Sequence, residues 1–178
     1  VLEVQEMDFL DLVKERFSVR SYSDKVVEDE KIAKILDAAK HAPTAVNYQP
    51  QQIYVLKSEE AIQKINSVCK CIFGAKTVFL ICYDENRAWR NKYIPGYNSG
   101  EVDASIVCDH MMLEAWNLGI GSCWVGMFDP VKVSEVFNLP ENIKPVALLP
   151  IGYAAPDCKP LEKMHNVFRP MEEMVTEL

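Results

Sequence analysis

Apolar residues recur at every third or fourth position in four stretches of the chain, which is the spacing of one face of an α-helix. We predict helices over 8–17, 29–42, 61–68 and 101–118. Asp8 can cap the first of them, and acidic residues in the first turn of the second favour its N-terminus. Pro43 then ends the second helix, because proline cannot continue one.

Three short apolar runs predict β-strands, at 53–56, 77–83 and 146–151. The run at 77–83 is apolar on both faces, as expected of a central strand in a covered sheet. A short helix from Asp129 and Pro130 to Phe137 precedes the last strand, since proline at the first helical position loses no hydrogen bond. Alternating strands and helices favour, on periodicity alone, an α/β fold with a parallel sheet. With no internal repeat or low-complexity linker, we expect residues 1–178 to form one domain.

The predicted helix at 101–118 is apolar almost all round, and Gly119 ends it. Such a helix must be buried on every side. It can lie at the centre of a monomer, or a second subunit can cover one of its faces. In a chain of 178 residues we favour the second arrangement, a homodimer.

Composition narrows the classes of function. The net charge of −7 argues against a surface that binds the phosphate backbone of a nucleic acid, so an anionic ligand must meet local positive charge. A hydrophobic content of 49% lets the chain bury a sizeable core without metal or disulfide crosslinks. The longest apolar run, around 78–82, is far too short to span a bilayer, so we expect no membrane residence.

The six cysteines are expected to be reduced thiols in the cytoplasm, because the core needs no crosslinks and no signal peptide is recognised at the start. Cys69 and Cys71 lack the two-residue spacer of redox and zinc motifs, and we predict no metal site. Whether these two thiols have a redox role stays open. The three histidines are scattered and show neither metal nor catalytic-triad spacing.

The most informative motif is Arg16-Phe17-Ser18-Val19-Arg20. In an extended segment its two guanidiniums and its hydroxyl point the same way and form a fork of donors suited to a phosphate. The alternative is that both arginines make surface salt bridges. The 43–50 segment follows as a loop between a helix and a strand, where exposed backbone donors can meet a ligand.

A dinucleotide fingerprint is not present, although Gly119 and Gly121 have part of its spacing. That motif needs a third glycine where Trp124 stands, and it follows a strand rather than a long helix. A nucleophile elbow at Ser122 fails as well, because Ile120 occupies its first glycine position.

Five blocks along the chain together resemble the nitroreductase family of FMN-dependent oxidoreductases. They are Arg16–Arg20, Pro43–Pro50, Leu118–Gly126, Pro145–Tyr153 and the closing Phe168–Glu173. The resemblance implies an α+β fold, an α-β-α sandwich with a mostly antiparallel central sheet, in an intertwined homodimer. It replaces the parallel sheet that periodicity alone favours.

The resemblance also implies a cofactor site. Arg16 and Ser18 would hold the FMN phosphate and ribityl chain, and Arg20 would lie at the pyrimidine edge of the ring, where its charge favours the reduced flavin. A backbone N–H near Val125 or Gly126 would donate to the ring nitrogen that accepts hydride. The implied cofactor-binding residues are Arg16, Phe17, Ser18 and Arg20 of the fork and Arg169 of the tail, together with two segments that line the ring from different subunits: Pro43, Thr44, Ala45 and Asn47 from one, and Trp124, Val125 and Gly126 from the other.

No catalytic side chain and no metal need come from the protein, because the flavin carries the chemistry. NADH or NADPH would deliver hydride, and a small electron acceptor of aromatic, nitro or quinone type would then take its place in a ping-pong cycle. Two alternatives stay open: an FMN-storing or FMN-sensing protein without catalysis, and a flavin-cleaving or dehalogenating enzyme of the same fold. Residues 84–100, rich in aromatic and polar side chains, are expected to form a mobile or induced segment over the site, and those aromatics either cover flat acceptors or serve ordinary packing.

Overall fold

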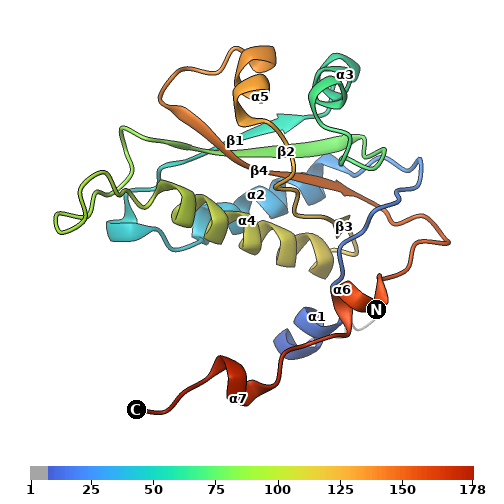
Figure 1. Ribbon diagram of the computed structural model, residues 1–178. Coiled ribbons are helices and arrows are strands. Elements are labelled where there is room, and N and C mark those ends of the chain that lie inside the picture. Colours follow the sequence, from blue (N-terminus) through green and yellow to red (C-terminus); the bar gives the residue numbers. More distant parts are fainter. Residues whose placement is uncertain (1–7) are drawn as a thin grey trace.

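A computed structural model describes residues 8–178 and shows one four-stranded sheet. Its strands are β1 (Gln51–Leu56), β2 (Thr77–Asp84), β3 (Gly121–Ser122) and β4 (Ile143–Gly152). They lie in the order β1-β2-β4-β3, and every neighbouring pair is antiparallel (Figure 1). The α+β fold is therefore confirmed, and the parallel sheet suggested by periodicity is wrong.

The sheet is antiparallel because the helical connections return the chain to the end of the sheet that it left. α3 (Glu59–Val68) follows β1, yet Leu56 at the end of β1 pairs with Val78 at the start of β2. A crossover to a parallel strand would instead have carried the chain back to the level of Gln51. Helical periodicity marks α3 in the sequence but does not encode at which end the next strand begins.

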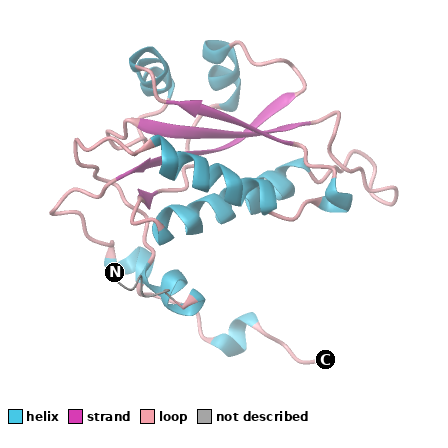
Figure 2. Cartoon of the chain, turned by 180° about the vertical axis from the view of Figure 1, so that it is seen from behind, coloured by secondary structure: helices cyan, strands magenta, loops and turns pink. Residues whose placement is uncertain are grey.

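Helices cover both faces of the sheet. α2 (Asp29–His41) and α4 (Gly100–Asn117) pack on one face, and α3 and α5 (Pro130–Phe137) pack on the other, as both views show (Figures 1 and 2). The expected α-β-α sandwich is confirmed. The remaining helices are α1 (Phe9–Glu15), the single 3₁₀ turn Ala45–Asn47, α6 (Glu162–His165) and α7 (Met171–Met174). Neither the short helices α6 and α7 nor the two-residue strand β3 is predicted by the hydrophobic pattern.

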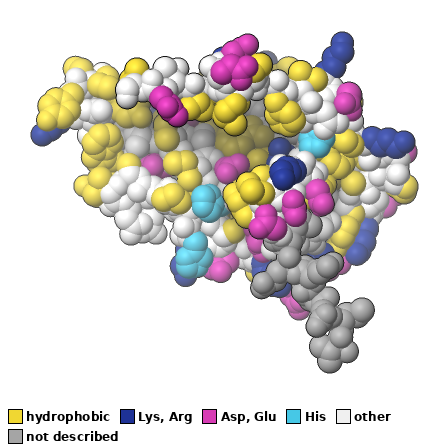
Figure 3. Space-filling model, turned by 90° about the horizontal axis from the view of Figure 1, so that it is seen from below, with side chains coloured by type: hydrophobic (Ala, Val, Ile, Leu, Met, Phe, Trp, Pro, Cys, Tyr) yellow, Lys and Arg dark blue, Asp and Glu magenta, His cyan; other side chains and the backbone are white. Residues whose placement is uncertain are grey.

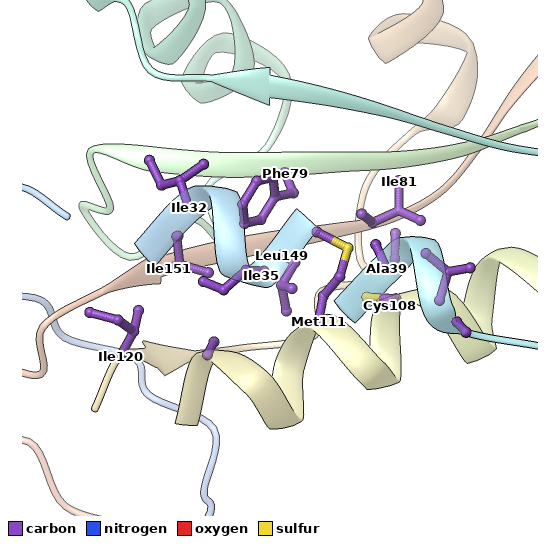
Figure 4. Close-up of a cluster of buried hydrophobic side chains, with 14 of the residues drawn as sticks. Ile32, Ile35, Ala39, Phe79, Ile81, Cys108, Met111, Ile120, Leu149 and Ile151 are labelled. Atoms are coloured by element: carbon purple, nitrogen blue, oxygen red, sulfur yellow. The ribbon is translucent and has the colours of Figure 1, made fainter. Parts of the chain in front are cut away.

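The two apolar layers meet at the central strands. Four fully buried side chains lie against one another between the sheet and the helices α2 and α4: Ile35, Phe79, Met111 and Leu149 (Figure 4). On the opposite face, Leu80 contributes to a second buried cluster with α3 and α5. β2 is thus buried on both faces, as its apolar sequence predicts.

The predicted helix ends are formed by side-chain caps. Asp8 accepts a hydrogen bond from the Leu10 N–H at 2.9 Å, and Asp129 accepts from the Val131 N–H at 3.0 Å. Pro130 is the first residue of α5, as predicted. The helices expected from periodicity therefore begin and end within a few residues of their predicted bounds.

One long face of α4 remains uncovered by residues 8–178. Its buried residues face α2 and the sheet, whereas Val102 is 49% exposed and Ile106 and Leu113 are only partly buried. Figure 3 looks onto this side of the molecule and shows hydrophobic side chains gathered around a hollow. The tail beyond α6 runs away from the sheet (Figure 1), and Phe168 in it is 80% exposed. Within the described chain, no helix has both the length and the apolar character required to cross a membrane.

Candidate functional site

The fork of Arg16, Ser18 and Arg20 lies along the edge of the sheet beside β3. α1 ends before Arg16, and the chain then continues extended: Ser18 pairs in parallel with Ser122, and the Val19 N–H donates to the Ser122 carbonyl at 2.9 Å. Gly121 permits this close approach, because a Cβ there would lie 2.5 Å from a methyl group of Val19. The extended geometry predicted for the fork is present.

The two arginines of the fork make no ion pair with any of residues 8–178. Arg20 Nη1 donates to the Ser18 carbonyl at 3.2 Å, whereas Arg16 Nη1 is buried without a hydrogen-bond partner in the described chain. A buried guanidinium nitrogen without an acceptor is costly, at about 1–3 kcal/mol or more. Among residues 8–178 the structure therefore shows no salt bridge of either arginine, and the fork fits an anionic oxygen such as that of a phosphate.

Ser122 is a second polar group at this edge without a partner. Its side chain is 1% exposed, and its Oγ has no hydrogen-bond partner among the described residues. The residues around Ser122 do not match a nucleophile elbow, and no sequence pattern links Ser122 to the fork. Only the pairing of Ser18 with Ser122, residues far apart in the chain, brings the two hydroxyl-bearing residues together.

Neighbouring thiol and phenol groups stay protonated around the fork. Burial raises the pKa of the Cys123 thiol, and the positive charge of Arg20 opposes that rise. Burial also raises the pKa of Tyr22, whose hydroxyl donates to the Pro150 carbonyl at 3.0 Å. Neither group is an acid or base near neutral pH, and the positive charge here remains that of the two arginines.

The Trp124–Gly126 segment continues beside β4. Val125 pairs with Leu148, and its N–H donates to the Leu148 carbonyl at 2.9 Å. That donor is used within the sheet, so of the two backbone N–H groups expected to face a ring, the one of Val125 already has an acceptor. The Gly126 N–H donates to no other group in residues 8–178, and a Cβ at this position would meet nothing within 4 Å. Trp124 is partly buried against the first core cluster.

Two predicted site residues have other contacts. The Phe17 ring packs edge-on against Trp116 of α4 and His165 of α6, with ring centroids 5.3 and 6.1 Å away. The Phe17 side chain therefore packs between α4 and α6, although its backbone lies within the fork segment. Arg169 donates to the carboxylate and carbonyl of Glu173, at 3.3 and 2.9 Å, in the tail. Within one chain, Arg169 is occupied by this pair.

The Pro43–Asn47 loop is held in an unusual conformation. Val46, Asn47 and Gln49 all have left-handed backbones, with φ of 55°, 55° and 50°. For a β-branched residue such as Val46 this is an outlier, and each such residue costs on the order of 1–3 kcal/mol. Thr44 Oγ1 closes the loop by accepting from the Gln49 N–H at 3.1 Å. Val46 is nevertheless 66% exposed at the loop's surface.

The fork and this loop lie at opposite edges of the sheet. The loop precedes the edge strand β1, and the fork runs beside β3 at the other edge. Three strand spacings, or about 14 Å, separate β1 from β3. Along α4 the loop contacts Asp103 and the fork segment contacts Trp116, thirteen residues or about 20 Å apart. One chain therefore brings the fork together with β3 and Trp124–Gly126 but does not unite them with Pro43, Thr44, Ala45 and Asn47.

The segment that follows β2 forms an irregular excursion held at its base. Arg90 pairs with Asn98, and the Ser99 N–H donates to the Trp89 carbonyl at 2.8 Å. Tyr93 at its tip is 80% exposed. Between the excursion and α4 lies a cavity of about 490 Å³, lined in part by Tyr97 and Ile106. The described residues contain no cluster of His, Cys, Asp or Glu placed to hold a metal ion.

Comparison with known proteins identifies the family of the chain. The model of the nitroreductase family matches residues 13–73 and 69–153. The chain belongs to the nitroreductase family. A nitroreductase family protein from Clostridium difficile 630 superposes with a TM-score of 0.89 at 38% identity, covering 96% of this chain and 98% of that one.

Two curated relatives of this nitroreductase family member extend the comparison. A putative NADH dehydrogenase/NAD(P)H nitroreductase of Methanothermobacter thermautotrophicus is 34% identical over 160 residues, which are 86% of this chain and 81% of the relative. An FMN reductase [NAD(P)H] of Bacillus subtilis is 29% identical over 155 residues, 78% of this chain and 62% of the relative.

Proposed function

We propose that this nitroreductase family member binds FMN and uses it to oxidise NADH or NADPH, passing the electrons to a small acceptor. The single observation that carries the proposal is Arg16 Nη1, a buried guanidinium nitrogen without a partner in the described chain, in a fork of extended backbone. The name of the Bacillus subtilis relative, an FMN reductase, supports FMN as the anionic ligand. Bound FMN supplies the hydride and electron transfer, and the protein supplies position and charge.

The residues of the fork hold the phosphate end of the cofactor. Arg16 offers a buried donor, and the adjacent Ser18 backbone lies fixed beside β3. Charge-assisted hydrogen bonds of this kind contribute about 1.5–3 kcal/mol each. Arg20 lies on the same segment, and its charge favours an electron-rich ring over a neutral one. The Gly126 N–H, which has no partner in residues 8–178, is placed on an open stretch of backbone where a ring nitrogen can accept from it.

The complete site requires two copies of the chain. The fork and Gly126 come from one copy, and the Pro43–Asn47 loop comes from the other, because one chain holds them at opposite sheet edges. The uncovered face of α4, with Val102 49% exposed, is the surface that the second copy covers. The exposed tail, which carries Arg169, extends from the body and reaches that copy.

The acceptor is a small aromatic molecule of nitro or quinone type that replaces the nicotinamide in a ping-pong cycle. The cavity between the excursion and α4, with Tyr97 in its lining, offers an aromatic wall for such a molecule. We expect the protein to work in the cytoplasm, where buried free thiols such as Cys82 and Cys108 stay reduced.

The proposal is tested by adding FMN to the purified protein and then mixing the complex with NADH or NADPH under anaerobic conditions in a stopped-flow instrument. Saturable binding of one FMN per chain, followed by bleaching of the flavin absorbance at a rate that depends on nicotinamide concentration, is the expected result. Tight FMN binding without reduction by either nucleotide would indicate a storage or sensor protein, and absence of FMN binding would overturn the proposal.

A further inference from the structure

Asp103 is a buried carboxylate that touches the Pro43–Asn47 loop. It lies in the first turns of α4 and is 2% exposed. Its Oδ1 accepts from the Ala45 N–H at 2.8 Å, and its Oδ2 accepts from the Ser99 hydroxyl at 2.7 Å. Both oxygens are therefore used, one on the loop and one on the end of the excursion.

No cation balances this carboxylate among residues 8–178, where all the ion pairs involve other acidic residues. Its charge is stabilised by the two hydrogen bonds and by the positive end of the α4 dipole. For stability alone, a well-packed apolar residue would serve as well or better at a buried position. The benefit of Asp103 must therefore lie in the geometry that its hydrogen bonds impose.

That geometry is the strained conformation of the loop. Left-handed backbones at Val46, Asn47 and Gln49 persist only where the surroundings fix the chain on both sides. Asp103 fixes the first residue of the turn, Ala45, and the Asp84 N–H fixes the far end by donating to the Pro50 carbonyl at 2.8 Å. Without the Ala45 contact, the loop loses the only bond in the described chain that ties its backbone to α4.

We infer that Asp103 is a positioning residue that sets the Pro43–Asn47 loop in the conformation that contacts the flavin. This inference rests on the proposed function. Asp103 itself belongs to α4, and it affects the loop through its hydrogen bond with the Ala45 N–H. Because Ser99 also contacts the Trp89 carbonyl, the same carboxylate joins the cofactor loop to the excursion beside the cavity.

Three variants separate position from charge and from stability. Asp103→Ala removes the acceptor of the Ala45 N–H, Asp103→Asn keeps an oxygen there without the charge, and Ser99→Ala removes only the second bond. Ile65→Ala, which opens the core on the opposite face of the sheet, is the matched control for general destabilisation. FMN affinity is measured by quenching of flavin fluorescence, and hydrogen exchange of the peptide covering the loop is measured on the protein without FMN.

Asp103→Ala is expected to weaken FMN binding about tenfold to a hundredfold and to remove the exchange protection of the Ala45 amide. Asp103→Asn is expected to keep both the FMN affinity and the exchange protection of the Ala45 amide within about threefold of wild type. Ser99→Ala and Ile65→Ala are expected to keep the Ala45 amide protected. A folded Asp103→Ala protein that binds FMN like wild type would overturn the inference, as would an Asp103→Asn protein as impaired as Asp103→Ala.

The two proposals can fail separately. If the wild-type protein does not bind FMN, the proposed function fails, and the exchange measurement still decides whether Asp103 holds the loop. If the wild type binds FMN and the loop amide stays protected in Asp103→Ala, the positioning role fails while the flavin function stands.

Discussion

At the scale of single residues, the site is defined by polar groups whose hydrogen-bonding capacity is not used. Among residues 8–178, Arg16 Nη1 and Ser122 Oγ are buried without hydrogen-bond partners, and the Gly126 N–H has no acceptor. Arg16 and Gly126 were predicted from the sequence through family resemblance, whereas Ser122 was not. Because buried polar groups are normally paired, such groups mark where a ligand is expected.

Arg20 is expected to tune the flavin more than it holds it. Its charge favours the reduced ring, so Arg20→Gln should lower the two-electron potential and slow reduction by NAD(P)H, while FMN binding changes less. The effect should be modest, since a partly hydrated charge at contact distance contributes a few kcal/mol at most at an effective dielectric near 20. Spectroelectrochemistry on the FMN-saturated protein measures it, with Arg20→Lys as a control that keeps the charge. An unchanged potential in Arg20→Gln would place Arg20 away from the ring.

Gly126 is expected to act through its backbone N–H. Gly126→Pro removes that donor, whereas Gly126→Ala keeps it and adds a methyl group to open space. Loss of one hydrogen bond to the ring, about 1 kcal/mol, should slow hydride transfer roughly fivefold or more in Gly126→Pro only. Single-turnover reduction rates decide this. Equal rates in the two variants would remove Gly126 from the reaction.

At the scale of elements, α4 organises the molecule. It packs α2 onto the sheet, ends next to β3 and the fork, and begins near the Asp103 carboxylate that contacts the Pro43–Asn47 loop. Its sequence is apolar on nearly every side, but residues 8–178 leave the side that carries Val102 uncovered. The uncovered side is the feature from which we propose a second copy.

A charge on the uncovered face of α4 should dissociate the proposed dimer. Val102→Asp replaces a half-exposed valine, so the isolated fold should tolerate it, but two such residues would be buried per dimer. At about 1 kcal/mol for each half-buried valine, before any cost of the charge, the dimer dissociation constant should rise at least tenfold. Val131→Asp, on the exposed surface of α5 at the other face of the sheet, is the control. Sedimentation equilibrium compares them, and equal dissociation constants would exclude α4 from the interface.

Most helices and strands could be predicted because their signals are local. The apolar spacing of 29–42 and the Asp129 cap each act within a few residues, and the structure confirms both elements. Strand direction could not be predicted from periodicity, because it depends on where a connection returns, as the pairing of Leu56 with Val78 shows. The role of Asp103 was equally hidden, since its partner Ala45 lies 58 residues away in the chain.

At the scale of the whole molecule, a cluster of polar side chains ties the end of the sheet to α2 and α4. The Tyr153 hydroxyl donates to Glu28 at 2.7 Å, and Lys31 donates both to Tyr153 and to the Leu118 carbonyl at the end of α4. Lys25 lies 3.3 Å from the Glu28 carboxylate and over the Tyr153 ring. Three segments far apart in sequence meet there.

Protonation of Glu28 at low pH should weaken this cluster and lower the stability of the fold. The hydrogen bond from Tyr153, with help from the Glu28 backbone and Lys25, lowers the pKa of Glu28 from its ordinary 4.5 to about 2. Since the folded-state pKa is the lower one, the contribution of Glu28 to stability is present above pH 4.5 and is lost as pH falls toward 2. Urea unfolding of wild type and Glu28→Gln should therefore differ at pH 6 and converge near pH 2. A difference that is constant across this range, or equal to that of the exposed control Glu30→Gln, would contradict the assignment.

A flavin site built from two copies of the chain can be tested with two complementary variants. Arg16→Ala removes the buried guanidinium of the fork, and Asn47→Ala alters the Pro43–Asn47 loop. Each variant alone should therefore bind FMN weakly. When the two are refolded together in equal amounts, half of the dimers should be mixed, and each mixed dimer should hold one unaltered site and one doubly altered site. An FMN titration of this mixture is predicted to show about one quarter of the wild-type number of sites, at wild-type affinity. A mixture that binds no more FMN than its separate components would contradict a site shared between two copies.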